Sequence, residues 1–314
     1  MAKYLGKRLL RSLLTLFLIL VITFILVRQM PIEGYFSNYD KMSQEQIANG
    51  IKQLGLDQPL YVQLFKFFKN LILHFDLGIS KVYRNNVPVA EILAPKIPIS
   101  VQLGGLSILF SMLVGLPMGT LMAKYKGRVF DHIGTGFIVL IEAVPAAVYY
   151  LFIQLYGTEL FHIKLLFDVK NPISWVLPVF SMSLGNIAYY AMWLRRYMVD
   201  ESHKDYVMLA RIKGVPGSKI MFRHIFRNAF VPMVQYLPTS FLNTVIGSIY
   251  IESLYSIPGM GGLLVNVIKK QDNSMVQGIV LLYACVGVIG LILGDLMMVL
   301  LDPRISFAKK GGSR

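Results

Sequence analysis

Residues 97–123 read IPISVQLGGLSILFSMLVGLPMGTLMA, a stretch without a single charged side chain. A helix needs about 20 mainly apolar residues to cross the hydrocarbon core of a bilayer, and this stretch exceeds that length. Further apolar stretches lie between Arg11 and Arg28 and at 133–157, 171–194, 228–251 and 274–301. The sequence therefore predicts an all-α integral membrane protein with six transmembrane helices.

The composition agrees with a protein that lies in lipid. Hydrophobic residues make up 55% of the 314 positions and charged residues only 15%, against about 25% in soluble domains. The one cysteine, Cys285, excludes a disulfide scaffold and a Cys-based metal cluster. The net charge of +14 is typical of basic loops that face anionic lipid, so we expect the bilayer, and no nucleic acid, as a partner.

Basic residues indicate the orientation of the chain. They gather in the N-terminal tail, in the loops after the second and fourth predicted spans, and in the C-terminal tail, which all fall on one side. The positive-inside bias makes that side the cytoplasm. The N-terminal tail is similar to the basic start of a signal peptide, since it contains Lys3, Lys7 and Arg8. No small-residue cleavage site follows it. We predict a multi-pass protein of the bacterial inner or plasma membrane with a retained first span and both termini cytoplasmic.

Residues 31–96 form the one sizeable segment on the predicted outer side. Mixed charges with scattered glycines and prolines indicate a small folded insertion. Within it, the stretch Tyr61 to Ile72 interleaves phenylalanines with Lys66 and Lys69. Two interpretations stay open: a helix packed on the membrane surface, or a docking shelf for an external partner.

Signatures of enzymes are absent. The sequence has no phosphate-binding G-x-x-x-x-G-K-[ST], no H-E-x-x-H, no G-x-S-x-G and no Cys-x-x-Cys, and its five histidines are scattered. We expect no catalytic residue, no metal site and no cofactor on this chain. An ATP-driven function would use ATP and Mg on separate ATPase subunits.

The most informative loop segment is residues 200–217, DESHKDYVMLARIKGVPG. Ser202 with Asp205 resembles a capping box, and Gly214 with Pro216 is a helix stop, so a short helix is predicted from His203 to Lys213. Tyr206, Ala210 and Lys213 recur at i, i+4 and i+7 and share one face. A small residue at the centre of such a face suits a helix-in-groove contact with a partner, and a helix lying on the lipid surface is the alternative.

Here the sequence resembles a known family. Asp205-Tyr206-Val207, Ala210 and Lys213-Gly214, followed by residues 222–224 and 227–229, look like the coupling loop of the dipeptide/oligopeptide/nickel family of ABC permeases, first-type subunit. Segments in the right order over nearly the whole chain also resemble that family: 54–60, 76–78, 252–261 and 301–304. By this resemblance Asp205, Tyr206, Val207, Ala210, Lys213 and Gly214 would couple the chain to an ATPase.

Two places depart from the family pattern. The Glu-Ala-Ala of the wider coupling motif is here Met208-Leu209-Ala210, and the Pro-Gly-Asp-Pro after the first span is here Pro31-Ile32-Glu33-Gly34. The second departure leaves open how a binding protein docks on 31–96.

Two ionisable residues lie inside predicted spans, where a charge is costly. Glu142 precedes Pro145, a residue that can open the third span toward a translocation path, so both are candidates to line the substrate route. Asp295 lies close to the signature at 301–304, where a structural partner is expected.

The resemblance implies a type I ABC importer permease fold and a set of partners. We divide the chain into the N-terminal tail and first span (1–30), an extracytoplasmic insertion (31–96), the permease core (97–304, with the coupling loop at 195–227) and a cytoplasmic tail (305–314). The implied partners are a second homologous permease, two cytoplasmic ATPase subunits and an extracytoplasmic substrate-binding protein.

By the resemblance, we expect di- and oligopeptides as the substrate, with nickel chelates and oligosaccharides as alternatives. An ion-coupled secondary transporter would show more ionisable residues at mid-membrane and often two related halves. A membrane-embedded enzyme would need clustered nucleophiles, acids or metal ligands, which the sequence lacks.

Overall fold

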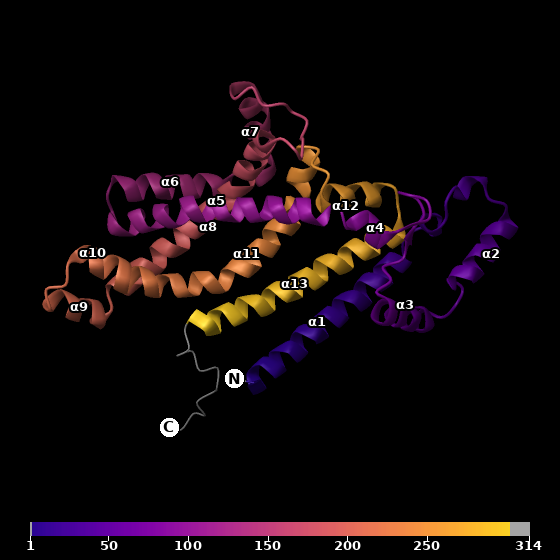
Figure 1. Cartoon of the computed structure of the whole chain (residues 1–314), viewed down its shortest axis with the longest axis horizontal. Helices are drawn as coiled ribbons and strands as arrows, with labels where there is room; N and C mark the ends of the chain where they lie inside the picture. The colour runs from indigo at the N-terminus through magenta and orange to yellow at the C-terminus, as the bar shows by residue number, and fades with distance from the viewer. Residues whose placement is uncertain (1, 302–314) are drawn as a thin grey trace. The chain divides into compact units, whose positions relative to one another are not determined.

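The computed structural model describes residues 2–301, and its elements are mainly helices (Figure 1). Contacts divide the chain into two compact units. Of the described residues, unit 1 comprises 101–257 and 289–301, and unit 2 comprises 2–100 and 258–288. The helices α5 (Ile97–Lys124) and α13 (Asn273–Leu301) contribute to both units. Residues 302–304 of the C-terminal signature and the predicted tail 305–314 lie outside the described residues.

Unit 2 starts with α1 (Ala2–Arg28) and contains the predicted insertion 31–96. The insertion consists of η1 (Ile32–Tyr35), η2 (Tyr39–Lys41), α2 (Gln44–Leu54), α3 (Leu60–His74), β1 (Ile79–Ser80), β2 (Val87–Pro88) and α4 (Val89–Leu93). The two strands pair antiparallel, and α12 (Met260–Lys269) with the start of α13 completes the unit. The segment 31–96 is therefore folded, as predicted.

Local sequence signals account for the bounds of α2. The Gln46 amide N–H donates to Ser43 Oγ (3.2 Å), and the Ser43 N–H donates back to Gln46 Oε1 (2.9 Å), which completes a capping box. Gly55, at φ +67°, ends the helix in a left-handed conformation that costs a glycine little.

A buried carboxylate joins the insertion to α13. Asp272 Oδ2 accepts a hydrogen bond from Ser80 Oγ (2.6 Å) and from the backbone N–H groups of residues 81, 82 and 83 (3.2, 3.0 and 2.9 Å). Its Oδ1 accepts from the N–H of Met275 in the first turn of α13 (3.1 Å). Asp272 and Ser80 are both fully buried. One side chain thus fixes the loop after β1 on the start of a long apolar helix.

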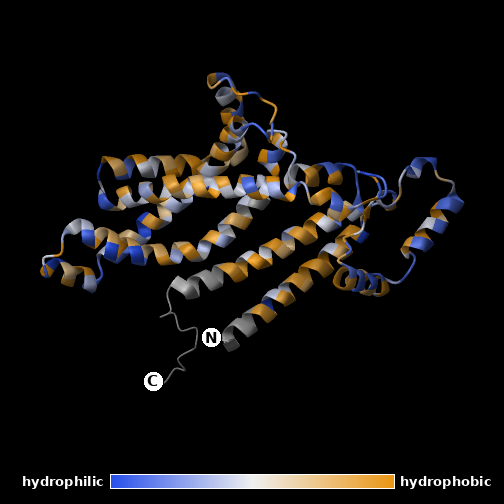
Figure 2. Ribbon diagram, viewed as in Figure 1, coloured by the Kyte–Doolittle hydropathy of each residue, from blue (hydrophilic) through white to orange (hydrophobic). Residues whose placement is uncertain are grey.

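The helix α3 packs along α1. Phe68 stacks on Phe17 with ring centroids 5.1 Å apart, and Phe67 lies 5.2 Å from Phe24. Apolar colour follows α1 and α13 over most of their length (Figure 2). Other apolar residues of α3, among them Phe65 and Ile72, are exposed. Contact with an apolar spanning helix favours the interpretation of this stretch as a membrane-surface helix.

Unit 1 is built around α8 (Pro172–Ser202), which packs against α6 (Val129–Ala143), α7 (Ala146–Leu160) and α11 (Arg227–Leu254). The helix α5 also approaches α8 closely. A Cβ on Gly115 would lie 3.0 Å from the Ile187 carbonyl oxygen, and one on Gly119 would lie 2.6 Å from that of Ala191. The two glycines therefore let the backbones of α5 and α8 meet, as small residues spaced by four do in membrane helices.

In the part of the chain that the structure describes, three helical segments are long and apolar enough to cross a membrane by length and composition: Leu9–Arg28, Ile97–Lys124 and Asn273–Leu293. The number rises to four if α6 and α7 count as one span. The predicted stretch 171–194 lies in the long helix α8 from residue 172 on, and the stretch 228–251 lies in α11. The count of six spans stays a prediction.

The predicted stretch 133–157 is not one continuous helix, which is a correction. The helices α6 and α7 meet at a bend of 104°. Val144 is extended (φ −90°, ψ 126°) and Pro145 caps the start of α7. Proline supplies no N–H for the helix ladder and disfavours helical geometry in the residue before it, so the helix breaks there.

Candidate functional site

The candidate site is the loop between α8 and α11, which contains the predicted coupling residues. Its elements are α9 (Asp205–Ile212), α10 (Gly217–Lys219) and η3 (Ile220–Phe226), a π-helix that runs directly into α11. A cluster of buried side chains, here named the loop core, holds these elements on α8 and α11. The loop core consists of Tyr190, Leu194, Met198, Val207, Ala210, Ile220, Ile225, Ala229 and Met233.

The start of α9 differs from the prediction. Helix α8 continues through Ser202, whose hydroxyl donates to the Val199 carbonyl (2.7 Å) inside that helix. The residue before α9 is Lys204, and its side chain makes no capping hydrogen bond. The predicted capping box of Ser202 and Asp205 is therefore wrong, because the serine is used by the preceding helix.

The predicted stop at Gly214 is confirmed. Gly214 has φ +72°, and its N–H donates to the Arg211 carbonyl (2.9 Å). The Val215 N–H donates to the Ala210 carbonyl (3.1 Å), so the chain turns back while the last carbonyls of α9 keep partners. Glycine suits this position because the left-handed region is strained for side chains with a Cβ.

Tyr206 joins three elements of the loop through its hydroxyl group. The hydroxyl bonds to the Glu201 carboxylate at the end of α8, lies 3.4 Å from the His224 carbonyl oxygen, and accepts a hydrogen bond from Asn228 Nδ2 (2.9 Å). Burial raises the pKa of Tyr206, and the hydrogen bond to Glu201 raises it further. The phenol therefore stays protonated and holds the ends of α8 and α11 on α9.

The structure corrects the predicted outward face of α9. Val207 is fully buried and Ala210 is 8% exposed, both in the loop core, so Ala210 does not lie at the centre of an outward face. Tyr206 is half-buried, whereas Asp205 and Lys213 are exposed. Tyr206 and Ala210 therefore hold α9 on its own chain.

The outward face of α9 carries three apolar residues beside the exposed Asp205 and Arg211. Met208 is 65% exposed, Leu209 52% and Ile212 74%, which is uncommon for three apolar residues on one short helix. Sequence reasoning missed them because it followed the spacing of Tyr206, Ala210 and Lys213. The sequence did contain a signal for this exposed apolar side. Residues 205–212 include more apolar residues than one buried face of a short helix can accommodate.

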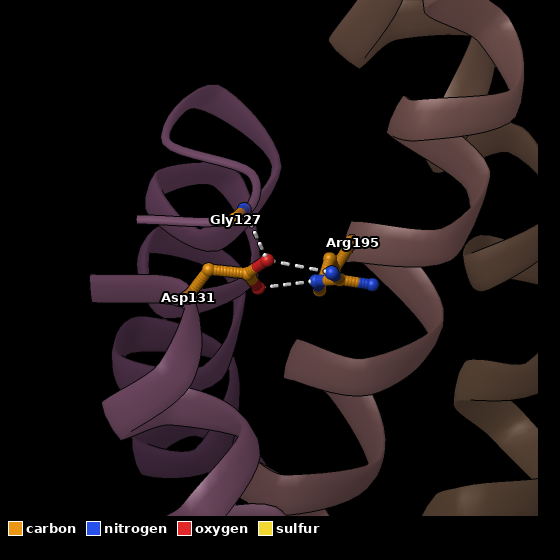
Figure 3. Close-up of polar contacts among 3 residues, drawn as sticks. All are labelled: Gly127, Asp131 and Arg195. Carbon is orange, nitrogen blue, oxygen red and sulfur yellow. Dashed lines mark hydrogen bonds and ion pairs between the residues drawn. The ribbon is translucent and has the colours of Figure 1, made fainter. Parts of the chain in front are cut away.

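A second polar contact supports the α8 end of the loop (Figure 3). Arg195 of α8 donates from Nε to Asp131 Oδ1 (2.5 Å) and from Nη2 to Oδ2 (2.7 Å), and the Gly127 N–H donates to the same Oδ2 (2.8 Å). The Asp131 side chain is 5% exposed and that of Arg195 is 30% exposed. This bidentate pair ties the start of α6 to α8, one residue beyond Leu194 of the loop core. Sequence reasoning counted Arg195 only as a loop charge.

The candidate path residues lie apart from this loop. Glu142 is in the last turn of α6 and Pro145 is at the start of α7, and both are exposed in the single chain. Their side chains flank the bend between the two helices. A role in the translocation path stays a prediction.

Comparisons with known proteins agree with the resemblance seen in the sequence. Residues 115–307 match the family of binding-protein-dependent transport system inner membrane components, and residues 1–104 match the N-terminal part of such membrane components. The chain is 31% identical over 308 residues to the dipeptide transport system permease protein DppB of Lactococcus lactis, which covers 97% of this chain and 99% of that protein.

A second relative is longer. The oligopeptide transport system permease protein AmiC of Streptococcus pneumoniae is 32% identical over 222 residues, which covers 69% of this chain and 44% of AmiC. The chain thus spans less than half the length of that relative.

A solved structure shows the same fold. A chain of the MetNI methionine ABC transporter in an inward-facing conformation superposes with a TM-score of 0.54 at 11% identity, covering 68% of this chain and 97% of that chain. The chain therefore belongs to the family of binding-protein-dependent transport system inner membrane components and has the fold of a type I ABC importer permease.

Proposed function

We propose that this chain is the permease subunit of an ATP-driven, binding-protein-dependent ABC importer for di- and oligopeptides. The names of its relatives DppB and AmiC support the substrate class. The basic loops support an orientation in which both termini and the loop 195–227 face the cytoplasm. The partners would be a second, related permease, two ATPase subunits that use ATP and Mg, and an extracytoplasmic binding protein.

The observation that carries the coupling role is that α9 has a buried inner side and an exposed, largely apolar outer side. Its inner side, with Val207 and Ala210, belongs to the loop core that also contains residues of α8 and α11. Its outer side presents Met208, Leu209 and Ile212. Exposed apolar residues on a short helix suit insertion into an apolar groove of a partner protein.

This arrangement suggests how ATPase motion would reach the membrane. A displacement of α9 acts on α8 and α11 together, because close-packed cores transmit strain and do not yield gradually. The Tyr206 hydroxyl adds hydrogen bonds to Glu201 at the end of α8 and to Asn228 at the start of α11. ATP-driven closure of the ATPase pair would thus move two long helices through one short helix.

The test uses the assembled transporter with its cognate ATPase subunits. The variants Met208→Asp and Ile212→Asp place a charge on the outer side of α9 without touching the loop core. We expect both to lose ATPase co-purification and peptide uptake in proteoliposomes by at least about tenfold, since burying an unpaired charge in an interface costs more than 1.4 kcal/mol.

Ser218→Asp is the matched control, because Ser218 is exposed in the same loop and the substitution adds the same charge. The Ser218→Asp variant should retain both ATPase co-purification and peptide uptake. Normal ATPase attachment in the two α9 variants would remove the coupling assignment. Uptake of a nickel chelate or an oligosaccharide, with no peptide uptake, would leave the coupling in place and change the substrate.

A further inference from the structure

A cavity of about 480 Å³ lies inside unit 2. It is partly open and is lined by the Arg28 end of α1, by α2 and α3 with the loop between them, by residues 76–79 and 81, and by the first turns of α13. Four of its lining side chains are basic and one is acidic: Arg28, Lys52, Lys66, Lys81 and Asp76. The cavity is therefore rich in positive charge.

Asp76 offsets one of the four positive charges, and within residues 2–301 none of the four basic side chains forms an ion pair with a carboxylate. Lys66 Nζ donates to the Gln58 amide oxygen (2.8 Å), and Lys81 Nζ donates to that of Asn86 (2.8 Å). The Arg28 guanidinium lies over the rings of Phe24 (4.9 Å) and Tyr35 (5.0 Å). Neutral partners and aromatic faces orient these cations but leave their charge in place, so the cavity favours an anion.

The sequence of the neighbouring elements suits a position of the cavity near the lipid headgroups. Arg28 ends the apolar segment Leu9–Arg28, and a basic residue at the end of such a segment lies at the membrane interface. Helix α3 packs on the same segment through Phe67 and Phe68. Its exposed apolar residues Phe65 and Ile72 suit contact with acyl chains beside the cavity.

We propose that this cavity binds the phosphate-bearing headgroup of an anionic phospholipid, with Arg28, Lys52, Lys66 and Lys81 providing the positive charge. Guanidinium and ammonium groups donate to phosphate oxygens, and a cavity of basic residues at the interface is the chemistry that recognises acidic lipids. The bound lipid would hold α3 and the rest of the insertion on the bilayer. This role is additional to transport and does not depend on the substrate.

The test is native mass spectrometry of the full-length chain, purified in detergent and mixed with equal amounts of phosphatidylglycerol and phosphatidylcholine. The wild-type chain should retain phosphatidylglycerol in preference to phosphatidylcholine. Arg28→Gln and Lys66→Gln should each reduce that preference about fivefold, the effect of one basic residue near an anionic surface.

Lys69→Gln is the matched control, since Lys69 is exposed on the same helix, does not line the cavity, and carries the same charge. Lys66 is exposed as well, so its replacement leaves the folded core intact. Equal retention of the two lipids by the wild-type chain, or an equal loss in the Lys69 variant, would overturn the proposal.

Two further measurements test whether the cavity binds free phosphate or a protein instead of a lipid. Millimolar inorganic phosphate should not displace the lipid, and binding of free phosphate without any lipid preference would overturn the assignment to a lipid. A loss of binding-protein affinity in the Arg28 and Lys66 variants, with lipid retention unchanged, would identify the cavity as a protein-docking site and would also overturn it.

Discussion

Single residues of α9 have opposite roles although they are neighbours in the chain. Val207 is fully buried in the loop core, while Met208 beside it is 65% exposed. Ala210 is small because α9 approaches the chain's own helices there, so Ala210→Asp would bury a charge inside the loop core. Loss of transport in that variant would report on loop stability, whereas loss in the Met208 variant would report on partner contact.

Asp272 holds the loop after β1 through four hydrogen bonds to one carboxylate oxygen. Asp272→Ala would leave the Ser80 hydroxyl and three backbone N–H groups of residues 81–83 without their acceptor. Since one unsatisfied buried donor costs about 1–3 kcal/mol, we expect a clear loss of local stability. Hydrogen–deuterium exchange of residues 80–84 should rise by at least about tenfold.

Asp76→Ala is the control for this prediction. Asp76 accepts one N–H, from Gly78 (2.8 Å), and it is exposed. Its removal should leave the exchange of residues 80–84 nearly unchanged. Equal exchange in the two variants would contradict the role assigned to Asp272.

At the scale of elements, the end of α9 depends on the backbone of one residue. A Cβ at Gly214 would meet no atom within 4 Å, so the position demands glycine for its φ of +72° and not for space. Gly214→Val should strain the turn by about 1–2 kcal/mol, increase hydrogen exchange in α9 and lower peptide uptake.

The variant Gly214→Asn shows whether the backbone conformation of residue 214 or the bulk of its side chain matters. Asparagine adopts the left-handed region more readily than valine, so this variant should retain most of the uptake. Equal losses for valine and asparagine would show that the side chain itself interferes, for example with a partner.

The pairing of α6 with α8 offers a test at the same scale. Asp131 and Arg195 form a bidentate ion pair with a mostly buried carboxylate. A double-mutant cycle with Asp131→Asn and Arg195→Gln, measured by denaturation in detergent, should give a coupling free energy of about 1–3 kcal/mol. Strictly additive effects would mean that the two side chains stabilise α6 and α8 independently.

At the scale of the whole molecule, orientation is the property that the basic loops predict. In a Cys285→Ser background, single cysteines at Glu45 or Lys269 should react with an impermeant thiol reagent added to intact cells, and one at Lys126 should not. All three positions are exposed, so access depends on the side of the membrane. Labelling of the Lys126 site alone would reverse the predicted topology.

The sequence by itself determined the properties that depend on neighbouring residues. Long uncharged stretches predicted the membrane-protein class, the mixed composition of 31–96 predicted a folded insertion, and Gly214 with Pro216 predicted the end of α9. Motifs along the chain were enough to indicate the family. These signals can be read along the chain without any tertiary contact, because hydropathy and turn chemistry act between neighbouring residues.

Only the tertiary structure decided which side of α9 is buried, how sharply the third predicted span bends, and that Asp272 binds a loop 192 positions away in the chain. An eight-residue helix with apolar residues on both sides has no periodic signal that tells inner from outer. Pro145 was visible, but the 104° bend depends on how α6 and α7 each pack against α8. These features arise from contacts between distant residues, whose energies no local pattern contains.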